Sequence, residues 1–139
     1  MMANTFYIST DTSNMDVPMI QDYLANDSYW AKGRSLESVE KSMKHSLCFG
    51  AFDKDHQQIG FARVATDYVV FAWVMDVFVK KEYQGKGIGE MLLRAIVDHG
   101  DLKSVNGIGL RTNDAQKFYQ RFGFETISEP NTWMFKSKR

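Results

Sequence analysis

A strand, a glycine-rich turn and a helix follow one another without a break between residues 71 and 100. Residues 71–79 form an apolar run interrupted only by Asp76, which is typical of a buried strand. From Ile88 onward, apolar residues recur at spacings of three and four, the pattern of a helix with one face on a core. The turn between them reads Gln84-Gly85-Lys86-Gly87-Ile88-Gly89. Backbone N–H groups of such a turn, and of the helix that it opens, can bind an anion such as a phosphate.

The spacing of these glycines decides which phosphate ligand they suit. A P-loop needs Lys and then Ser or Thr after its last glycine, whereas Ile88 follows Gly87. The dinucleotide fingerprint needs a third glycine at the position of Glu90, whose carboxylate would repel a pyrophosphate. The pattern that fits is Gln-x-x-Gly-x-Gly, which resembles the acetyl-CoA signature of the GNAT superfamily of N-acetyltransferases. In that family the loop and the helix N-terminus hold the CoA pyrophosphate. A solvent-exposed turn without a ligand is the alternative explanation of the glycines alone.

A second segment is similar to the same family. Residues 112–124, TNDAQKFYQRFGF, match its Asn-x-x-Ala-x-x-x-Tyr-x-x-x-Gly-Phe segment with one departure. The family's asparagine stands seven residues before the tyrosine, a place held here by Thr112, so a contact of Asn113 with CoA stays open. The resemblance implies that Tyr119 is the general acid that protonates the departing thiolate. On helical spacing alone, Tyr119 could equally be a core residue.

Length and composition restrict the remaining possibilities. The chain has 139 residues, which predicts one domain over residues 1–139. With 17 basic and 17 acidic residues the net charge is zero, so neither nucleic acid nor an anionic membrane is an expected partner. The single cysteine, Cys48, cannot form an internal disulfide and favours a reducing compartment, which predicts a cytoplasmic protein. The histidines do not stand at metal-ligand spacing, and no metal is expected.

The order of the expected elements is typical of the same family. The patterns predict a strand over residues 5–10, a helix capped by Asp16, and a second helix capped by Ser35. A hairpin of residues 47–52 and 58–65 precedes strand 71–79 and the helix that follows the glycine turn. A strand over 105–111, a helix capped by Thr112 or Asn113, and a closing hairpin of 124–127 and 132–135 complete the chain. This order, β-α-α-β-β-β-α-β-α-β-β, is that of the GNAT fold: an α/β (α+β) protein with a mixed, mostly antiparallel sheet flanked by helices.

The resemblance also implies how acetyl-CoA would be held as co-substrate. The family's fourth strand carries a bulge, expected here at residues 77–79, whose free N–H groups pair with pantetheine and stabilise the oxyanion. The implied binding residues are Val77, Phe78, Val79, Gln84, Gly85, Lys86, Gly87, Ile88, Gly89, Asn113 and Tyr119.

The sequence determines the general base and the acceptor pocket less well than it determines the acetyl-CoA loop. Strand alternation places Asp76 on the face of Val74 and Phe78, where it could be a structural ion-pair partner, a base, or the relay for a water. Some members of the family have no dedicated base and take up a neutral amine. The family's acceptor pocket lies between the first two helices and the final hairpin, which implies the residues Tyr29, Trp30, Arg34 and Trp133. Plain packing explains Trp30 and Trp133 equally well.

The expected activity is that of an acyltransferase. An acetyl-CoA-dependent N-acetyltransferase would move the acetyl group to a primary amine of a small molecule or peptide by direct attack in a ternary complex. The alternative is a CoA-binding regulatory module without catalysis, because a fold alone does not guarantee chemistry. The sequence does not identify the acceptor, and it allows a homodimer.

Overall fold

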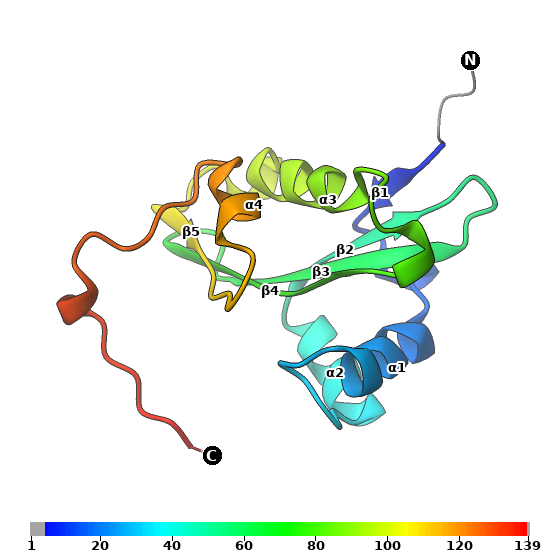
Figure 1. The fold of residues 1–139 in the computed structure, drawn as a ribbon, viewed down its shortest axis with the longest axis horizontal. Helices are drawn as coiled ribbons and strands as arrows, with labels where there is room; N and C mark the ends of the chain where they lie inside the picture. The colour runs from blue at the N-terminus through cyan, green and yellow to red at the C-terminus, as the bar shows by residue number, and fades with distance from the viewer. Residues whose placement is uncertain (1–4, 139) are drawn as a thin grey trace.

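Five strands form one sheet in the computed structural model, which describes residues 5–138 (Figure 1). They follow chain order across the sheet. Neighbouring strands from β1 to β4 pair antiparallel, and β5 pairs parallel to β4. The strands are β1 Tyr7–Ser9, β2 Leu47–Phe52, β3 Gln58–Thr66, β4 Phe71–Val79 and β5 Gly107–Gly109. The fold is therefore the expected mixed sheet, with β1 and β5 shorter than predicted.

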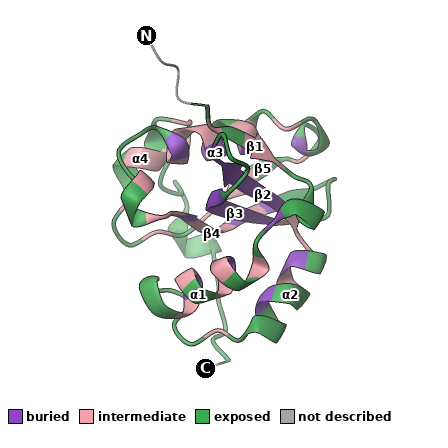
Figure 2. Ribbon diagram, turned by 90° about the vertical axis from the view of Figure 1, so that its right-hand side faces the viewer, coloured by how far each residue is buried: buried purple, intermediate pink, exposed green. Residues whose placement is uncertain are grey.

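Two layers of helices cover the sheet. Helices α1 (Val17–Asp27) and α2 (Leu36–Lys44) lie on one face, and α3 (Ile88–Val97) and α4 (Gln116–Gln120) lie on the other (Figure 1). Each face has its own buried cluster: Phe49 and Leu92 belong to the α3 side, and Ile20 and Phe61 to the α1–α2 side. Figure 2 shows the buried residues concentrated in the sheet between these layers.

The predicted helix caps are confirmed. Asp16 Oδ1 accepts the N–H of Met19 at 3.1 Å, and Ser35 Oγ accepts the N–H of Ser38 at 3.1 Å. Before α4, Thr112 Oγ1 accepts the N–H of Ala115 at 3.1 Å, so Thr112 rather than Asn113 supplies the side-chain acceptor. Gly123, at φ 92°, follows α4 in the left-handed conformation that ends many helices.

The bulge in β4 lies one residue earlier than predicted. Phe61 pairs with Phe78 and Arg63 pairs with Met75, so Asp76 and Val77 together oppose one residue of β3. Asp76 has a φ of 57°. The extra residue reverses the alternation: Val74 packs on the α3 side, but Phe78 packs on the α1–α2 side. The prediction that Asp76 shares a face with Val74 was therefore wrong, because strict alternation fails at a bulge.

The predicted closing hairpin is not formed. Residues 124–138, which we call the C-terminal arm, contain no strand and only a 3-10 turn at Pro130–Thr132. Pro130 lacks an N–H and has a fixed φ, and the segment offers no glycine for a tight primed turn. The Trp133 ring lies against Trp73 of β4, with ring centroids 6.0 Å apart, and the last part of the arm extends away from β5 (Figure 1).

None of the helices within residues 5–138 combines the length and the apolar character that crossing a bilayer requires.

Candidate active site

The glycine turn has the backbone geometry of an anion site. Gly85 and Gly87 have φ values of 81° and 84°, and a Cβ built at either would meet no atom within 4 Å. Glycine is thus required there for conformation rather than for space. Gly87 is the N-cap of α3 and no side chain caps this helix, so the first-turn N–H groups are available to a ligand. The Gln84 side chain donates to the Val79 carbonyl at 2.9 Å and ties the turn to the end of β4.

Helix α4 is held against this turn. A Cβ on Gly89 would lie 3.4 Å from the Phe118 ring, so the backbone of α3 and the ring are in direct contact. Glu90 in the first turn of α3 accepts from Arg121 at 2.6 Å and from Arg94 at 3.3 Å. These contacts fix the position of Tyr119 relative to the anion site.

The second half of β4 has an open edge. Parallel pairing with β5 covers only the first three residues of β4, which oppose Gly107–Gly109. Beyond them, no described strand pairs with β4 on this side. Val77 and Val79 are half-buried against the α3 cluster, whereas Phe78 is buried and stacks on Tyr23 with ring centroids 4.1 Å apart. The backbone at residues 77–79 is therefore anchored by its side chains, and its edge toward β5 has no strand partner.

A cleft of about 1470 Å³ opens beside β5 and α4. Its walls come from β5, α4, the loop after α1 and the C-terminal arm. Among the predicted site residues it is lined by Tyr29, Trp30, Asn113, Tyr119 and Trp133. The Tyr29 hydroxyl accepts the N–H of Asn113 at 3.3 Å and so joins two walls of the cleft. Three of the four predicted acceptor residues, Tyr29, Trp30 and Trp133, thus line one cleft with Tyr119, and their role stays a prediction.

Tyr119 is partly buried in the wall of this cleft. Its ring packs edge-on against Phe118 and Phe124. Burial, followed by the proximity of Tyr29 and Asp114, raises the pKa of Tyr119 to about 12. Within residues 5–138 no protein group hydrogen-bonds to its hydroxyl. At neutral pH, Tyr119 thus keeps its proton, and no acceptor among the described residues takes a hydrogen bond from it.

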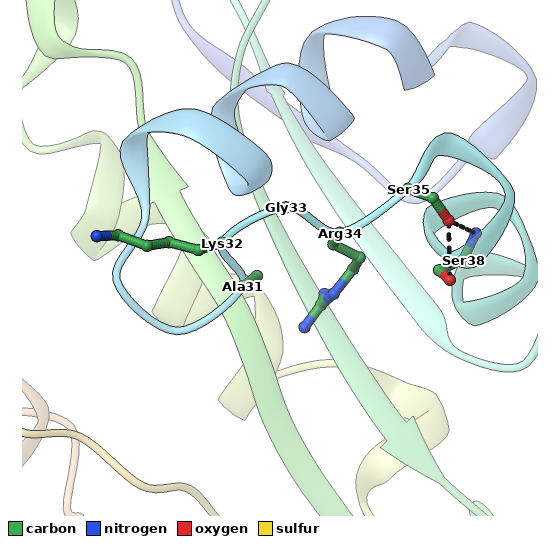
Figure 3. A pocket seen from close by; sticks show the side chains of 6 residues that line it. All are labelled: Ala31, Lys32, Gly33, Arg34, Ser35 and Ser38. Carbon is green, nitrogen blue, oxygen red and sulfur yellow. Dashed lines mark hydrogen bonds between the residues drawn. The ribbon is translucent and has the colours of Figure 1, made fainter. Parts of the chain in front are cut away.

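Asp76 lies outside the cleft in a buried ion-pair cluster. Its Oδ2 accepts from Arg34 at 2.7 Å and from Arg63 at 2.9 Å, and its Oδ1 accepts from the Trp30 indole at 3.0 Å. Arg34 therefore does not line the cleft with the other predicted acceptor residues. Arg34 lies instead at a small separate pocket of about 320 Å³, which Lys32 also lines. Figure 3 shows the Lys32 and Arg34 side chains extending in different directions.

Sequence reasoning missed Arg63. It is the lone basic residue in the apolar strand β3, adjacent to the strand that carries the lone acidic residue Asp76. Two opposite charges in neighbouring buried strands were the available signal, since buried charges are normally paired.

Possible metal ligands are not gathered anywhere in the described part of the chain, where no three His, Cys, Asp or Glu side chains form a group that could hold an ion. Cys48 is buried, and burial raises the pKa of its thiol to about 11.

Comparison with known proteins identifies the family. The family model for the acetyltransferase (GNAT) domain matches residues 44–126. A solved structure of a GNAT-family protein from Xanthomonas campestris pv. campestris is 39% identical, covers 95% of this chain and 92% of its own, and superimposes with a TM-score of 0.92. The GCN5-related N-acetyltransferase 2, chloroplastic, of Arabidopsis thaliana is 35% identical over 73% of this chain, which spans 41% of that relative's length.

A more distant structure carries ligands. Rv2747 from Mycobacterium tuberculosis, solved in complex with CoA and NLQ, is 17% identical, with a TM-score of 0.73 over 88% of this chain and 73% of its own. At this identity the likeness concerns the fold. The glycine turn, the sheet with its open β4 edge and the matches to known proteins lead to one conclusion: this chain belongs to the GNAT acetyltransferase family.

Proposed function

We propose that this chain is an N-acetyltransferase that moves the acetyl group of acetyl-CoA to a primary amine of a small molecule or peptide, by direct attack in a ternary complex. The observation that carries the proposal is the placement of Tyr119 in a large cleft, on a helix packed against an uncapped, glycine-opened helix N-terminus. One acetyltransferase domain over residues 1–139, working in the cytoplasm, is part of the proposal and rests on the sequence.

The residues at the glycine turn suit the diphosphate of acetyl-CoA. Two left-handed glycines leave open space where side chains would stand, and the N–H groups of α3 have no side-chain acceptor. Lys86 is exposed in the same turn and adds a positive charge. The open edge of β4 at Val77, Phe78 and Val79 would hold the extended arm of the ligand by backbone hydrogen bonds, and Asn113 would contact it from the cleft wall.

Bound acetyl-CoA supplies a thioester, whose carbonyl carbon forms the new C–N bond and whose sulfur leaves with the electrons of the C–S bond. The chain itself holds and orients the thioester and protonates the sulfur that leaves. Backbone N–H groups at the bulge of β4 stabilise negative charge on the carbonyl oxygen, a contribution of about 3 kcal/mol for one such donor. Tyr119 offers its proton to the departing sulfur, because its pKa keeps it neutral at physiological pH. The proton that the attacking nitrogen loses on forming the amide restores the Tyr119 hydroxyl, directly or through water.

Asp76 has a structural role in this proposal. Its carboxylate is already engaged by two guanidinium groups and one indole, so an incoming amine would have to displace a charged partner. The amine is therefore taken up in its neutral form. Tyr29, Trp30 and Trp133 would form its aromatic surroundings, while Arg34 supports the loop that carries Trp30.

An amine panel with a free-thiol readout tests the proposal. The purified chain is incubated with acetyl-CoA and primary amines that differ in size, charge and aromatic character, and thiol release is compared with a reaction lacking amine. We expect amine-dependent release and an acetylated product of matching mass. Calorimetric binding of acetyl-CoA without transfer to any amine would instead favour the non-catalytic CoA-binding module, and absence of binding would refute both.

A further inference from the structure

The loop that joins α1 to α2, residues 28–35, is braced by its own hydrogen bonds. Ser28 Oγ donates to the Leu24 carbonyl at 2.7 Å and accepts the N–H of Ala31 at 3.1 Å. Both Ser28 and Ala31 are buried. The backbone of this loop is therefore fixed to the end of α1, and the side chains that leave it start from a defined position.

Three side chains of the loop reach other parts of the molecule. The Trp30 indole and the Arg34 guanidinium donate to the two oxygens of Asp76 in β4, at 3.0 and 2.7 Å. The Tyr29 hydroxyl accepts the N–H of Asn113 at 3.3 Å. Tyr29 and Trp30 pack edge to face, with ring centroids 5.1 Å apart. The loop thus connects the bulge of β4 with the segment that leads into α4.

Trp30 contacts both the ion-pair cluster and the cleft. Its N–H is bonded to Asp76, yet the residue is 38% exposed and lines the cleft that also contains Tyr119. A tryptophan side chain has two rotatable torsions, so a partly exposed ring without a hydrogen bond can take several orientations. The bond to Asp76 selects one orientation, and one wall of the cleft is fixed with it.

The bulge of β4 directs the Asp76 carboxylate to this loop. Strict alternation would place it on the α3 side with Val74, whereas the inserted residue, at a φ of 57°, turns it to the other side. A left-handed conformation is uncommon for a residue other than glycine and persists where surrounding contacts hold it. Here the contacts come from Arg34, Arg63 and Trp30. The strand thus departs from regular pairing where one carboxylate serves three donors.

We propose that Asp76 is a positioning residue for the acceptor amine: its carboxylate fixes the Trp30 ring that forms a wall of the cleft. Asp76 acts through Trp30 and itself lies outside the cleft. The selection of the amine therefore depends on a buried residue that the amine does not touch. This inference rests on the proposed acetyl transfer, because the acceptor is part of that proposal.

A set of variants separates positioning from stability. Asp76→Asn keeps the size of the side chain and a residue type that tolerates the left-handed region. Its single oxygen is taken by the guanidinium groups, and its NH₂ then opposes the indole N–H, so Trp30 loses its acceptor. Trp30→Phe removes the same hydrogen bond and leaves the charges untouched. Arg63→Met is the control, since it removes one partner of Asp76 while Arg34 still holds the carboxylate and Trp30 stays bonded.

Steady-state kinetics with an accepted amine distinguishes the variants. We expect the KM for the amine to rise about tenfold in Asp76→Asn and in Trp30→Phe, with kcat within about threefold of wild type. Combining these two changes should raise KM no further, because both act through one hydrogen bond. Arg63→Met should lose stability and keep its KM. Asp76→Asn combined with Arg63→Met should recover stability and keep the raised KM.

The indole N–H signals in the NMR spectrum of isotope-labelled protein give a reading without activity. The chain has three tryptophans, and Trp30→Phe identifies the signal of Trp30. Its exchange with water should be at least about tenfold faster in Asp76→Asn than in wild type. Unchanged exchange, or a KM that follows stability across the variants, contradicts the positioning role. A wild-type chain that acetylates no amine would instead refute the proposed function, and with it the acceptor role of Trp30.

Discussion

At the scale of single residues, Tyr119 combines a raised pKa with a hydroxyl to which no group in the described part of the chain hydrogen-bonds. Tyr119→Phe keeps the packing of the ring and removes only the hydroxyl. We expect turnover to fall by about 10²–10⁴-fold, while acetyl-CoA affinity and thermal stability change little. The loss should be the same for every amine, because the leaving thiolate is common to all, and a thioester of a more acidic thiol should restore the rate. Tyr68→Phe, at an exposed turn, is the control. If Tyr119→Phe turns over within about threefold of wild type, Tyr119 does not donate the proton and its role is packing.

The raised pKa of Tyr119 also predicts a loss of stability in alkali. The folded-state pKa of about 12 lies above the ordinary value of 10, so the folded chain holds this proton more tightly than the unfolded chain. The corresponding stability is complete below pH 10 and is lost as the pH rises from 10 through 12. Between pH 9 and pH 11 the free energy of unfolding should fall by about 1 kcal/mol more in wild type than in Tyr119→Phe. Urea denaturation of both proteins at the two pH values measures this difference, and equal losses would contradict it.

Asp76 is the residue whose removal should affect stability most directly. Asp76→Asn leaves the Arg63 guanidinium, whose side chain is 10% exposed, without its carboxylate. We expect a loss of about 3 kcal/mol in the free energy of unfolding, partly recovered by adding Arg63→Met. Glu90→Gln, which disrupts an exposed pair, should cost less than about 1 kcal/mol. If Asp76 were the base, turnover of the still-folded Asp76→Asn protein would collapse and its pH profile would change, whereas a structural role leaves that profile in place.

At the scale of elements, the junction of the glycine turn with α3 is where the ligand should be held. Gly87→Val places a β-branched residue at a φ of 84°, which should cost about 1–2 kcal/mol and close the space beside the helix N-terminus. We expect at least a tenfold loss of acetyl-CoA affinity by calorimetry. Gly33→Val is a matched control, since Gly33 has a φ of 74°, equally open surroundings and a place remote from α3. It should lose similar stability and retain its affinity. Unchanged affinity in Gly87→Val would mean that the loop is only a turn.

At the scale of the whole molecule, acetyl-CoA should stabilise the fold by mass action. At 100 times its dissociation constant it contributes about 2.7 kcal/mol, which raises the Tm of a chain of this size by about 8 °C. Adenosine, which lacks the diphosphate, should raise the Tm much less. Scanning fluorimetry with both compounds checks this prediction, and equal shifts would indicate that the anion site takes no part.

The features that the sequence determined by itself are those that depend on near neighbours. Asp16 and Ser35 cap helices because each acceptor lies three residues from its donor. The strand at Phe71–Val79 and the helix at Ile88 follow from local patterning, and the glycine turn between them follows from a backbone that only glycine adopts readily. The family resemblance rests on these same short-range features, and for that reason the fold class could be predicted correctly.

Tertiary structure decided what depends on pairing between distant segments. The register of β3 against β4 placed the bulge at Asp76 and turned its carboxylate toward Arg63 and Arg34, so Arg34 does not line the cleft with Tyr29, Trp30 and Trp133. Strand alternation could not reveal this, because a single inserted residue reverses every side chain beyond it. Residues 132–136 likewise have the composition of a strand, but a strand forms only where a free edge accepts it. In the described chain the free edge is that of β5, and residues 132–136 form no strand against it.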